Sequence, residues 1–267
     1  MADTSGTDPH APVRKAAWIA AGAPPDLEPG RVHVWRVDLD EPGWGSEAMA
    51  ALLGAEDRER AARLVLARHR RQFAAGRSAL RTILSGYADT DGPASLAFAA
   101  DRSGKPFLAG PDGALGLSFN MSHSGGIALV VAARGAAVGV DIERLRPGVR
   151  IADIARRQFS PDITRTLLAL EPSRQPAAFL RCWCALEARL KALGTGFSAG
   201  ADVMAQMSLP DSLLASLDAE EWSGIAGRWL VTSLDVGEGY GAAVAVDAAA
   251  VHAAGDWLTT FQARAPA

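Results

Sequence analysis

Cysteine is scarce in this chain, and long apolar runs are missing altogether. Only Cys182 and Cys184 occur among 267 residues. On a helix, side chains two residues apart point about 200° away from each other, so these two cannot form a disulfide. A chain without a disulfide framework is typical of the reducing cytoplasm, which we expect as its location. No stretch of about 18 apolar residues occurs, so we expect no membrane span.

Excess charge of either sign is lacking too. The 27 basic and 30 acidic residues leave a formal net charge of −3, which gives no general attraction to polyanions. We therefore expect neither nucleic acid nor a membrane as a partner. Hydrophobic residues make up 49% of the chain, enough for a sizeable core. Residues 1–29 lack the basic start and apolar centre of a secretion signal and are expected to form a flexible tail, as are residues 253–267.

The order of periodic segments predicts an α+β (mixed α/β) protein. Strands, an arginine-rich helical region over 52–87 and a hairpin around residues 122–126 are followed by a second set of helices and strands. The later helices are expected over 151–159, 161–170 and 177–193, and the closing strands over 204–209, 228–234 and 240–246. Two similar halves, 30–135 and 136–252, are expected to join near Gly135.

The segment Val138-Gly-Val-Asp-Ile-Glu143 is apolar, β-branched and interrupted by two acids. Side chains alternate along a strand, so Asp141 and Glu143 project from one face. Two adjacent carboxylates repel each other and are most stable with a cation between them. Taken alone, the pair also fits a solvated strand edge with Arg144 and Arg146 as ion-pair partners.

The segment Trp183-Cys-Ala-Leu-Glu-Ala-Arg-Leu-Lys191 has helical spacing, which places Glu187 and Lys191 one turn apart. These two residues can simply pair on a helix surface. The apolar neighbours argue against this, because a carboxylate on a mostly buried helix needs another partner. Three carboxylates and a lysine together predict a Mg²⁺ and phosphate site, and hence chemistry on a phosphate ester.

Four motifs in order carry a resemblance to a known family: Gly104-Lys-Pro106, Phe119-Asn-Met-Ser-His-Ser-Gly125, Gly139-Val-Asp-Ile-Glu143 and Trp183-x-x-x-Glu187-Ala-x-x-Lys191-Ala-x-Gly194. This order and spacing resembles the 4′-phosphopantetheinyl transferases, in the larger single-chain subfamily that includes the activator of surfactin synthetase. The resemblance spans roughly residues 32–246. It implies two pseudo-twofold related halves, each a small, mostly antiparallel sheet packed with helices.

The resemblance implies an enzyme that uses Mg²⁺ to transfer 4′-phosphopantetheine from CoA to a serine of an apo acyl or peptidyl carrier protein. The second product is 3′,5′-ADP. Carriers of fatty acid, polyketide and nonribosomal peptide synthesis and of the lysine pathway all remain open as the partner. Because both halves lie on one chain, a monomer can build the whole cleft between them.

The resemblance also implies roles for individual residues. Asp141, Glu143 and Glu187 would hold Mg²⁺, and Glu187 is the expected base. Lys191 and His123, with Ser122, would contact the phosphates, whereas Lys105 would contact the nucleotide. Taken singly, His123 in a turn is more often inert, and Lys105 in a turn is usually plain surface. The arginine-rich region is mostly a solvated helix face, from which we select three candidates for the CoA 3′-phosphate, because guanidinium suits phosphate: Arg68, Arg71 and Arg77.

One position departs from the family pattern. Many relatives have a lysine directly before the helix glutamate, where this chain has Leu186. If Leu186 lines the cleft, Leu186→Lys should tighten CoA binding; if it packs in the core, the lysine should destabilise the fold. We expect the first outcome. Two other functions remain open: a Mg²⁺-dependent phosphohydrolase, and a catalytically weak module that binds CoA or a carrier protein.

Overall fold

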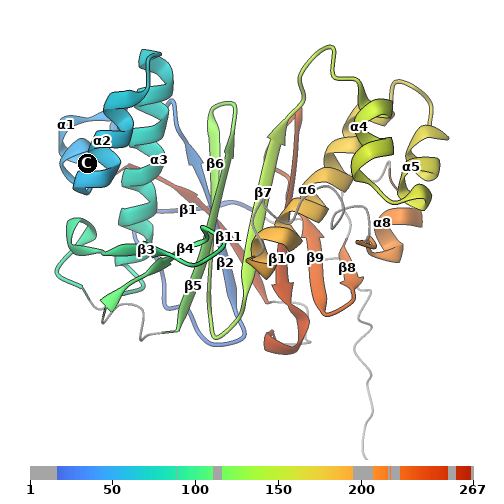
Figure 1. Cartoon of the computed structure of the whole chain (residues 1–267). Helices are drawn as coiled ribbons and strands as arrows, with labels where there is room; N and C mark the ends of the chain where they lie inside the picture. Colours follow the sequence, from blue (N-terminus) through green and yellow to red (C-terminus); the bar gives the residue numbers. More distant parts are fainter. Residues whose placement is uncertain are drawn as a thin grey trace, which may run out of the picture.

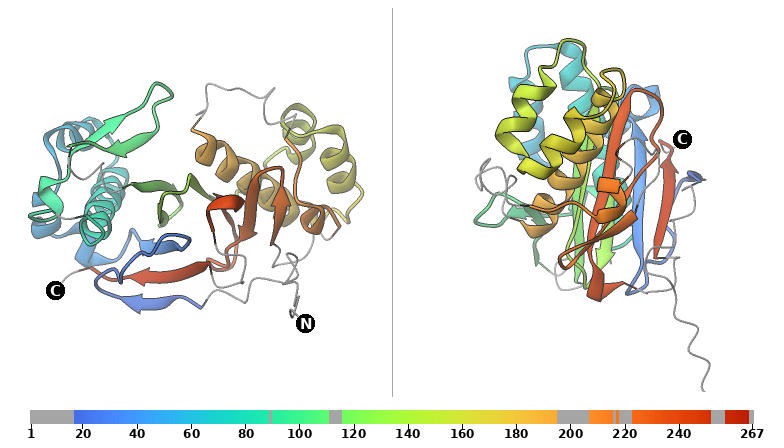
Figure 2. Two further views of the ribbon diagram at one scale, coloured as in Figure 1. Left: turned by 90° about the horizontal axis from the view of Figure 1, so that it is seen from below. Right: turned by 90° about the vertical axis from the view of Figure 1, so that its right-hand side faces the viewer.

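The computed structural model describes residues 17–88, 90–110, 116–194, 207–215, 217, 223–251 and 257–265. It shows the expected mixed α+β architecture, with a five-stranded and a four-stranded sheet side by side, each packed with helices (Figure 1). Seen from below, the helices of the two halves lie at opposite ends of the molecule, with strands between them (Figure 2). In the described part of the chain, no helix is both long and apolar enough to cross a membrane.

The N-terminal half is built on the sheet order β1-β11-β2-β6-β5. Strands β2 (Val32–Asp38), β6 (Ile127–Arg134) and β5 (Leu117–Ser124) pair antiparallel, as the predicted hairpin requires. Turn η1 (Pro42–Gly45) and helices α1 (Glu47–Ala51), α2 (Ala55–Arg63) and α3 (Ala67–Ser85) follow β2. Turn η2 (Pro93–Ser95) precedes a separate hairpin of β3 (Phe98–Ala100) and β4 (Pro106–Leu108).

The C-terminal half has the antiparallel order β7-β10-β9-β8. Its strands are β7 (Val138–Arg144), β8 (Ser223–Ala226), β9 (Trp229–Ser233) and β10 (Tyr240–Asp247), and β10 is followed by turn η5 (Ala248–Ala250). Its helices are α4 (Ile151–Gln158), α5 (Pro161–Leu168), α6 (Gln175–Leu193) and α8 (Asp211–Ala215). Of the strand expected over 204–209, residues 204–206 lie outside the described residues and Met207–Leu209 are not in a strand.

The expectation of tails at both ends needs correction. Residues 258–263 form β11, which lies inside the N-terminal sheet between β2 and β1 (Ile19–Ala21) and runs parallel to both. Phe261 stacks on Trp35 with ring centroids 4.6 Å apart, so this strand closes over the core. Its partner β2 lies more than 200 residues earlier in the sequence. A short, half-polar segment with such distant partners gives little local signal.

The two halves share a core in addition to their own. One apolar cluster packs the N-terminal sheet against α3, and another packs the C-terminal sheet against α6. A third contains residues of both sheets, including Val34 and Val131 from one and Val140 and Val244 from the other. The seam runs between β5 and β7, where Val140 N donates to Asn120 Oδ1 at 3.1 Å. The halves are therefore held together by a common apolar layer.

A buried histidine lies in the first of these cores. His33 Nδ1 and Trp35 Nε1 each lie 2.8 Å from the hydroxyl of Tyr87. Indole N–H can only donate, so the hydroxyl accepts from Trp35 and is free to donate to a neutral His33. Burial, reinforced by the charge of Arg31, lowers the pKa of His33 from 6.5 to about 4. The native state therefore holds His33 uncharged.

We predict that acid weakens the fold through His33. The unfolded chain binds a proton near pH 6.5, whereas the native state does so only near pH 4, so this contribution is complete above pH 6.5 and is lost as the pH falls towards 4. The loss should reach about 3 kcal/mol. His33→Gln keeps an acceptor for Tyr87 but cannot titrate. Urea denaturation between pH 7.5 and 4.5 should show a shallower fall in unfolding free energy for this variant; equal slopes would contradict the assignment.

Candidate active site

The site is formed where helix α6 lies directly on strand β7. Gly139 makes this close approach possible, because a Cβ there would collide with the carbonyl oxygen of Ala188 and the amide nitrogen of Ala192. Any other residue at this position would push the helix away from the strand. The contact brings Glu187 and Lys191 of α6 to the face of β7 that carries Asp141.

Asp141 is the centre of a closed set of hydrogen bonds. Its Oδ1 accepts from Lys191 Nζ at 2.5 Å and from Ser122 Oγ at 3.0 Å. Lys191 Nζ also donates to Ser122 Oγ at 2.9 Å. Asp141 is only 3% exposed, and its second oxygen, Oδ2, is buried without a hydrogen-bond partner among the described residues. A buried carboxylate oxygen without a hydrogen-bond partner is a candidate ligand for a cation.

Two further carboxylates feel the charge of Asp141. Burial, and then the charge of Asp141, raise the pKa of Glu187 from 4.5 to about 7, although Lys191 opposes the shift. Burial is also the main cause of the raised pKa of Glu143, whose Oε2 accepts a hydrogen bond from Ser124 Oγ at 2.9 Å. Lys191 therefore pairs with Asp141 of β7. The alternative, a simple ion pair between Lys191 and Glu187 on the surface of α6, is not what the structure shows.

His123 lies beside this cluster, at the end of β5. His123 is an exposed residue, but partial burial and then the positive charges of Lys191 and Arg60 lower its pKa. Arg60 comes from α2, and its guanidinium carbon lies 5.4 Å from the centroid of the Phe73 ring. The sequence analysis did not select Arg60. The sequence marks Arg60 only as one of many arginines in an arginine-rich stretch. Which of them lies near His123 depends on how α2 packs.

The other predicted cations lie elsewhere. Lys105 Nζ donates to the carbonyl oxygens of Val138 and Ala192, at 3.2 and 3.3 Å, and so crosses from one half to the other. Arg77 is engaged by the buried Asp57, with Nε to Oδ1 at 2.7 Å. Arg68 pairs with Asp40 at 3.0 Å. Arg71 is exposed on α3 and makes no ion pair within the described part of the chain.

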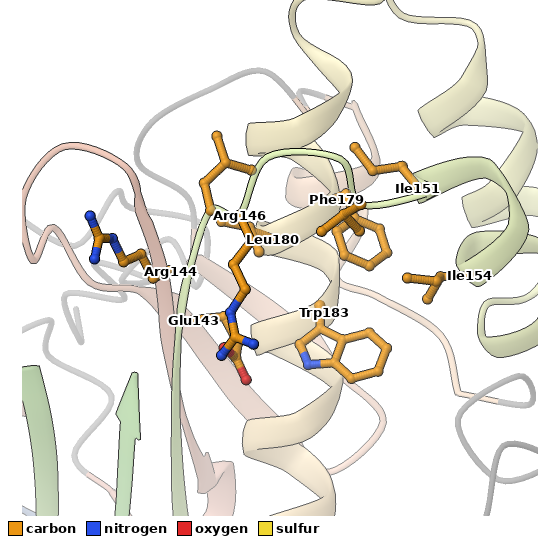
Figure 3. Close-up of a pocket in the computed structure, with 10 residues that line it drawn as sticks. Glu143, Arg144, Arg146, Ile151, Ile154, Phe179, Leu180 and Trp183 are labelled. Atoms are coloured by element: carbon orange, nitrogen blue, oxygen red, sulfur yellow. The ribbon is translucent and has the colours of Figure 1, made fainter. Parts of the chain in front are cut away.

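An apolar pocket of about 230 Å³ opens beside Glu143 (Figure 3). Its floor is formed by α4 and α6, and Arg146 reaches over it towards the Glu143 carboxylate, whereas Arg144 points away. The apolar lining consists of Leu145, Val149, Ile151, Ile154, Phe179, Leu180 and Trp183. The pocket can accept an apolar group whose other end lies near the carboxylates.

The three carboxylates are not arranged as a complete metal-binding site. Within the described ranges, no three His, Cys, Asp or Glu side chains lie in positions that could together hold a metal ion. The ammonium of Lys191 takes the position on Asp141 Oδ1. The donor set is nevertheless that of a hard cation, because Asp141 lies close enough to raise the pKa of both glutamates and one of its own oxygens is unpaired among the described residues.

Comparison with known proteins gives two family matches that together cover most of the chain. Residues 137–245 match the 4′-phosphopantetheinyl transferase superfamily, and residues 43–135 match the N-terminal model of 4′-phosphopantetheinyl transferase. The transferase HetI of Nostoc sp. is 37% identical over 177 residues, which are 66% of this chain and 74% of HetI. A 4′-phosphopantetheinyl transferase of Bacillus subtilis is 33% identical over 170 residues, 62% of this chain and 72% of that protein.

A putative 4′-phosphopantetheinyl transferase of Synechocystis sp. is 31% identical over 201 residues, 75% of this chain and 78% of the relative. The matches therefore extend through both halves of the structure, including β5, β7 and α6.

Leu186 does not line the cleft. It is fully buried and packs in the core cluster between α6 and the C-terminal sheet. We expected a lysine at this position to tighten CoA binding because Leu186 would line the cleft. That assumption is wrong, since the side chain at this position of α6 points into apolar surroundings.

We predict that Leu186→Lys destabilises the protein by about 3 kcal/mol or more, because an ammonium in this core has no counter-charge. The melting temperature should fall by roughly 10 °C. Leu193→Lys is the matched control, since Leu193 is 45% exposed in the last turn of the same helix. Its effect should stay within about 0.5 kcal/mol. Similar melting temperatures for the two variants would show that α6 packs differently.

Proposed function

Because this chain belongs to the 4′-phosphopantetheinyl transferase superfamily and transfers phosphopantetheine from CoA to carrier proteins, we propose which of its residues carry the reaction. A serine hydroxyl of the apo carrier protein attacks the β-phosphate of CoA. The new bond joins the serine oxygen to phosphorus, and 3′,5′-ADP leaves with the electron pair of the broken bond. The observation that carries this proposal is the group of Asp141, Lys191 and Ser122 with Glu187 beside it.

Asp141, Glu143 and Glu187 are proposed to hold Mg²⁺. Two observations support this: Oδ2 of Asp141 is buried without a hydrogen-bond partner among the described residues, and burial together with neighbouring carboxylates raises the pKa values of both glutamates. A hard divalent cation meets this need with oxygen ligands. When bound, Mg²⁺ neutralises pyrophosphate oxygens and acts there as a Lewis acid.

Cationic side chains are proposed to bind the phosphates of CoA. Lys191 lies at the centre of the site, and His123 lies close enough to both Lys191 and Arg60 for their charges to lower its pKa. The charges of Lys191 and Arg60, together with a ring N–H donated by His123, would stabilise the negative charge that develops on the leaving group. Among the three arginines proposed for the 3′-phosphate, Arg71 is favoured, since Arg68 and Arg77 are held by carboxylates. Lys105 remains a proposed nucleotide contact.

Glu187 is the proposed general base. Burial and the charge of Asp141 raise the pKa of Glu187, which makes its carboxylate a stronger base than an exposed one, although a bound cation would lower this pKa again. The adjoining apolar pocket is proposed to receive the pantetheine chain, because its apolar lining ends at Glu143. This placement would keep the transferred group beside the reacting phosphate.

The proposal is tested by incubating several apo carrier proteins with CoA and Mg²⁺ and measuring their mass. A gain of one phosphopantetheine identifies both the transfer and the partner. A parallel incubation without carrier protein separates transfer from hydrolysis, because a phosphohydrolase releases phosphopantetheine without an acceptor. Chelation of Mg²⁺ by EDTA should stop the mass gain, and added Mg²⁺ should restore it.

We predict that Asp141→Ala lowers the transfer rate at least about 100-fold at saturating Mg²⁺, because it removes both a proposed metal ligand and the partner of Lys191. Glu171→Ala, at an exposed acid just before α6, is the control and should retain the full rate. Comparable rates for Asp141→Ala and the control would show that the carboxylates of β7 take no part in the reaction.

We also predict that Glu187→Gln, which keeps the shape of the side chain but cannot accept a proton, lowers kcat about 100-fold. Single-turnover rates and Mg²⁺ affinity should be measured on the same preparation. Normal turnover together with normal Mg²⁺ affinity would exclude Glu187 as the base.

A further inference from the structure

The turn between β5 and β6 lies at the seam of the two halves and is separated from His123 only by Ser124. It contains Gly125 and Gly126, called here the glycine turn, and each glycine faces a side chain from a different half. The placement of His123 therefore depends on how this turn is held.

The N-terminal half holds the turn through Gly126. Leu39 N donates to the carbonyl oxygen of Gly126 at 2.8 Å, and a Cβ at Gly126 would lie 2.8 Å from Oδ2 of Asp40. The carboxylate of Asp40 is itself fixed from α3, accepting from Arg68 Nη2 and Gln72 Nε2, each at 3.0 Å. Asp40 thus connects the beginning of α3 to the glycine turn.

The C-terminal half holds the turn through Gly125. This residue has a φ of 62°, in the left-handed region, and a Cβ there would collide with the hydroxyl oxygen of Tyr240. Tyr240 lies at the start of β10, directly opposite Arg144 of β7. Just before the turn, Ser124 Oγ accepts from Arg144 N at 3.0 Å and donates to Glu143. The turn is therefore packed on both sides, and a methyl group on either glycine would have to displace a side-chain oxygen.

We propose that Asp40 and Tyr240 are positioning residues, which hold the glycine turn from opposite halves and thereby set His123 against the carboxylates of β7. Asp40 and Tyr240 act through the glycine turn and are not proposed to contact the phosphates. The inference rests on the proposed role of His123 as a phosphate contact. The pair of Asp40 with Arg68 has side chains about half exposed, so its effect on stability should be small. Its effect should appear in CoA binding.

A double-mutant cycle on Gly126 and Asp40 tests the inference with CoA and an apo carrier protein as substrates. Gly126→Ala should raise the KM for CoA about tenfold, since the methyl group displaces the turn. Asp40→Ala should raise it about threefold, because the turn loses its support, and Asp40→Asn, which keeps one acceptor oxygen, should raise it less. The double variant should be less impaired than Gly126→Ala alone, because removal of the carboxylate vacates the space that the methyl group needs.

Tyr240→Phe tests the support from the C-terminal half, since this substitution removes only the hydroxyl that faces Gly125. It should raise the KM for CoA about twofold and leave the KM for the carrier protein unchanged. Asp162→Ala is the matched control, because its exposed ion pair with Arg165, at 3.1 Å, is remote from the turn. Its kinetics should equal those of the parent protein, and melting temperatures should confirm that all variants fold.

His123→Ala separates this inference from the proposed function. If His123→Ala raises the KM for CoA but Asp40→Ala does not, or if the double variant is no better than Gly126→Ala, the positioning role is refuted and the phosphate role stands. If His123→Ala leaves the KM for CoA unchanged, the phosphate role fails and the inference fails with it.

Discussion

The contact between α6 and β7 is the constraint on which the site depends. Gly139 meets the helix at the Ala188 to Ala192 turn, and on the neighbouring strand Gly241 meets it at Leu180. Without side chains at these two positions, the helix backbone lies directly on the sheet. The same approach removes Asp141 and Glu187 from water, and in the lower dielectric their repulsion and their attraction to Lys191 both become stronger.

The second requirement is a polar seam between the halves. Strands β5 and β7 lie side by side, and the hydrogen bonds that join them here involve the side chains of Asn120, Ser122 and Ser124. These three residues alternate along β5 and so share one face. Beneath the seam, the shared apolar cluster keeps both sheets in a fixed relation. A rigid apolar layer thus supports a polar site that contains charges of both signs.

Local periodicity was a good guide to the elements that surround the site. Alternation in 138–143 predicted a strand with Asp141 and Glu143 on one face, and this segment is β7. Helical spacing in 183–191 predicted α6, and Gly194 ends it in the left-handed conformation. Distant pairings were missed: β11 was taken for a tail because the strands that flank it, β1 and β2, lie far away in the sequence. Such pairing depends on the folded surface and leaves no periodic signature of its own.

By itself, the sequence determined the chemical types present, their spacing and the family pattern, since these depend only on residue order and on the geometry of single elements. Only the tertiary structure decided which member of a group acts. In the folded protein, Leu186 lies in the core and Arg60 lies near His123. Arg77 pairs with Asp57, and Lys191 pairs with Asp141. Each of these outcomes depends on the rotation and packing of a helix against a partner remote in sequence. A rotation of about 100° separates one residue of a helix from the next, so small differences in packing select the residue that faces the site.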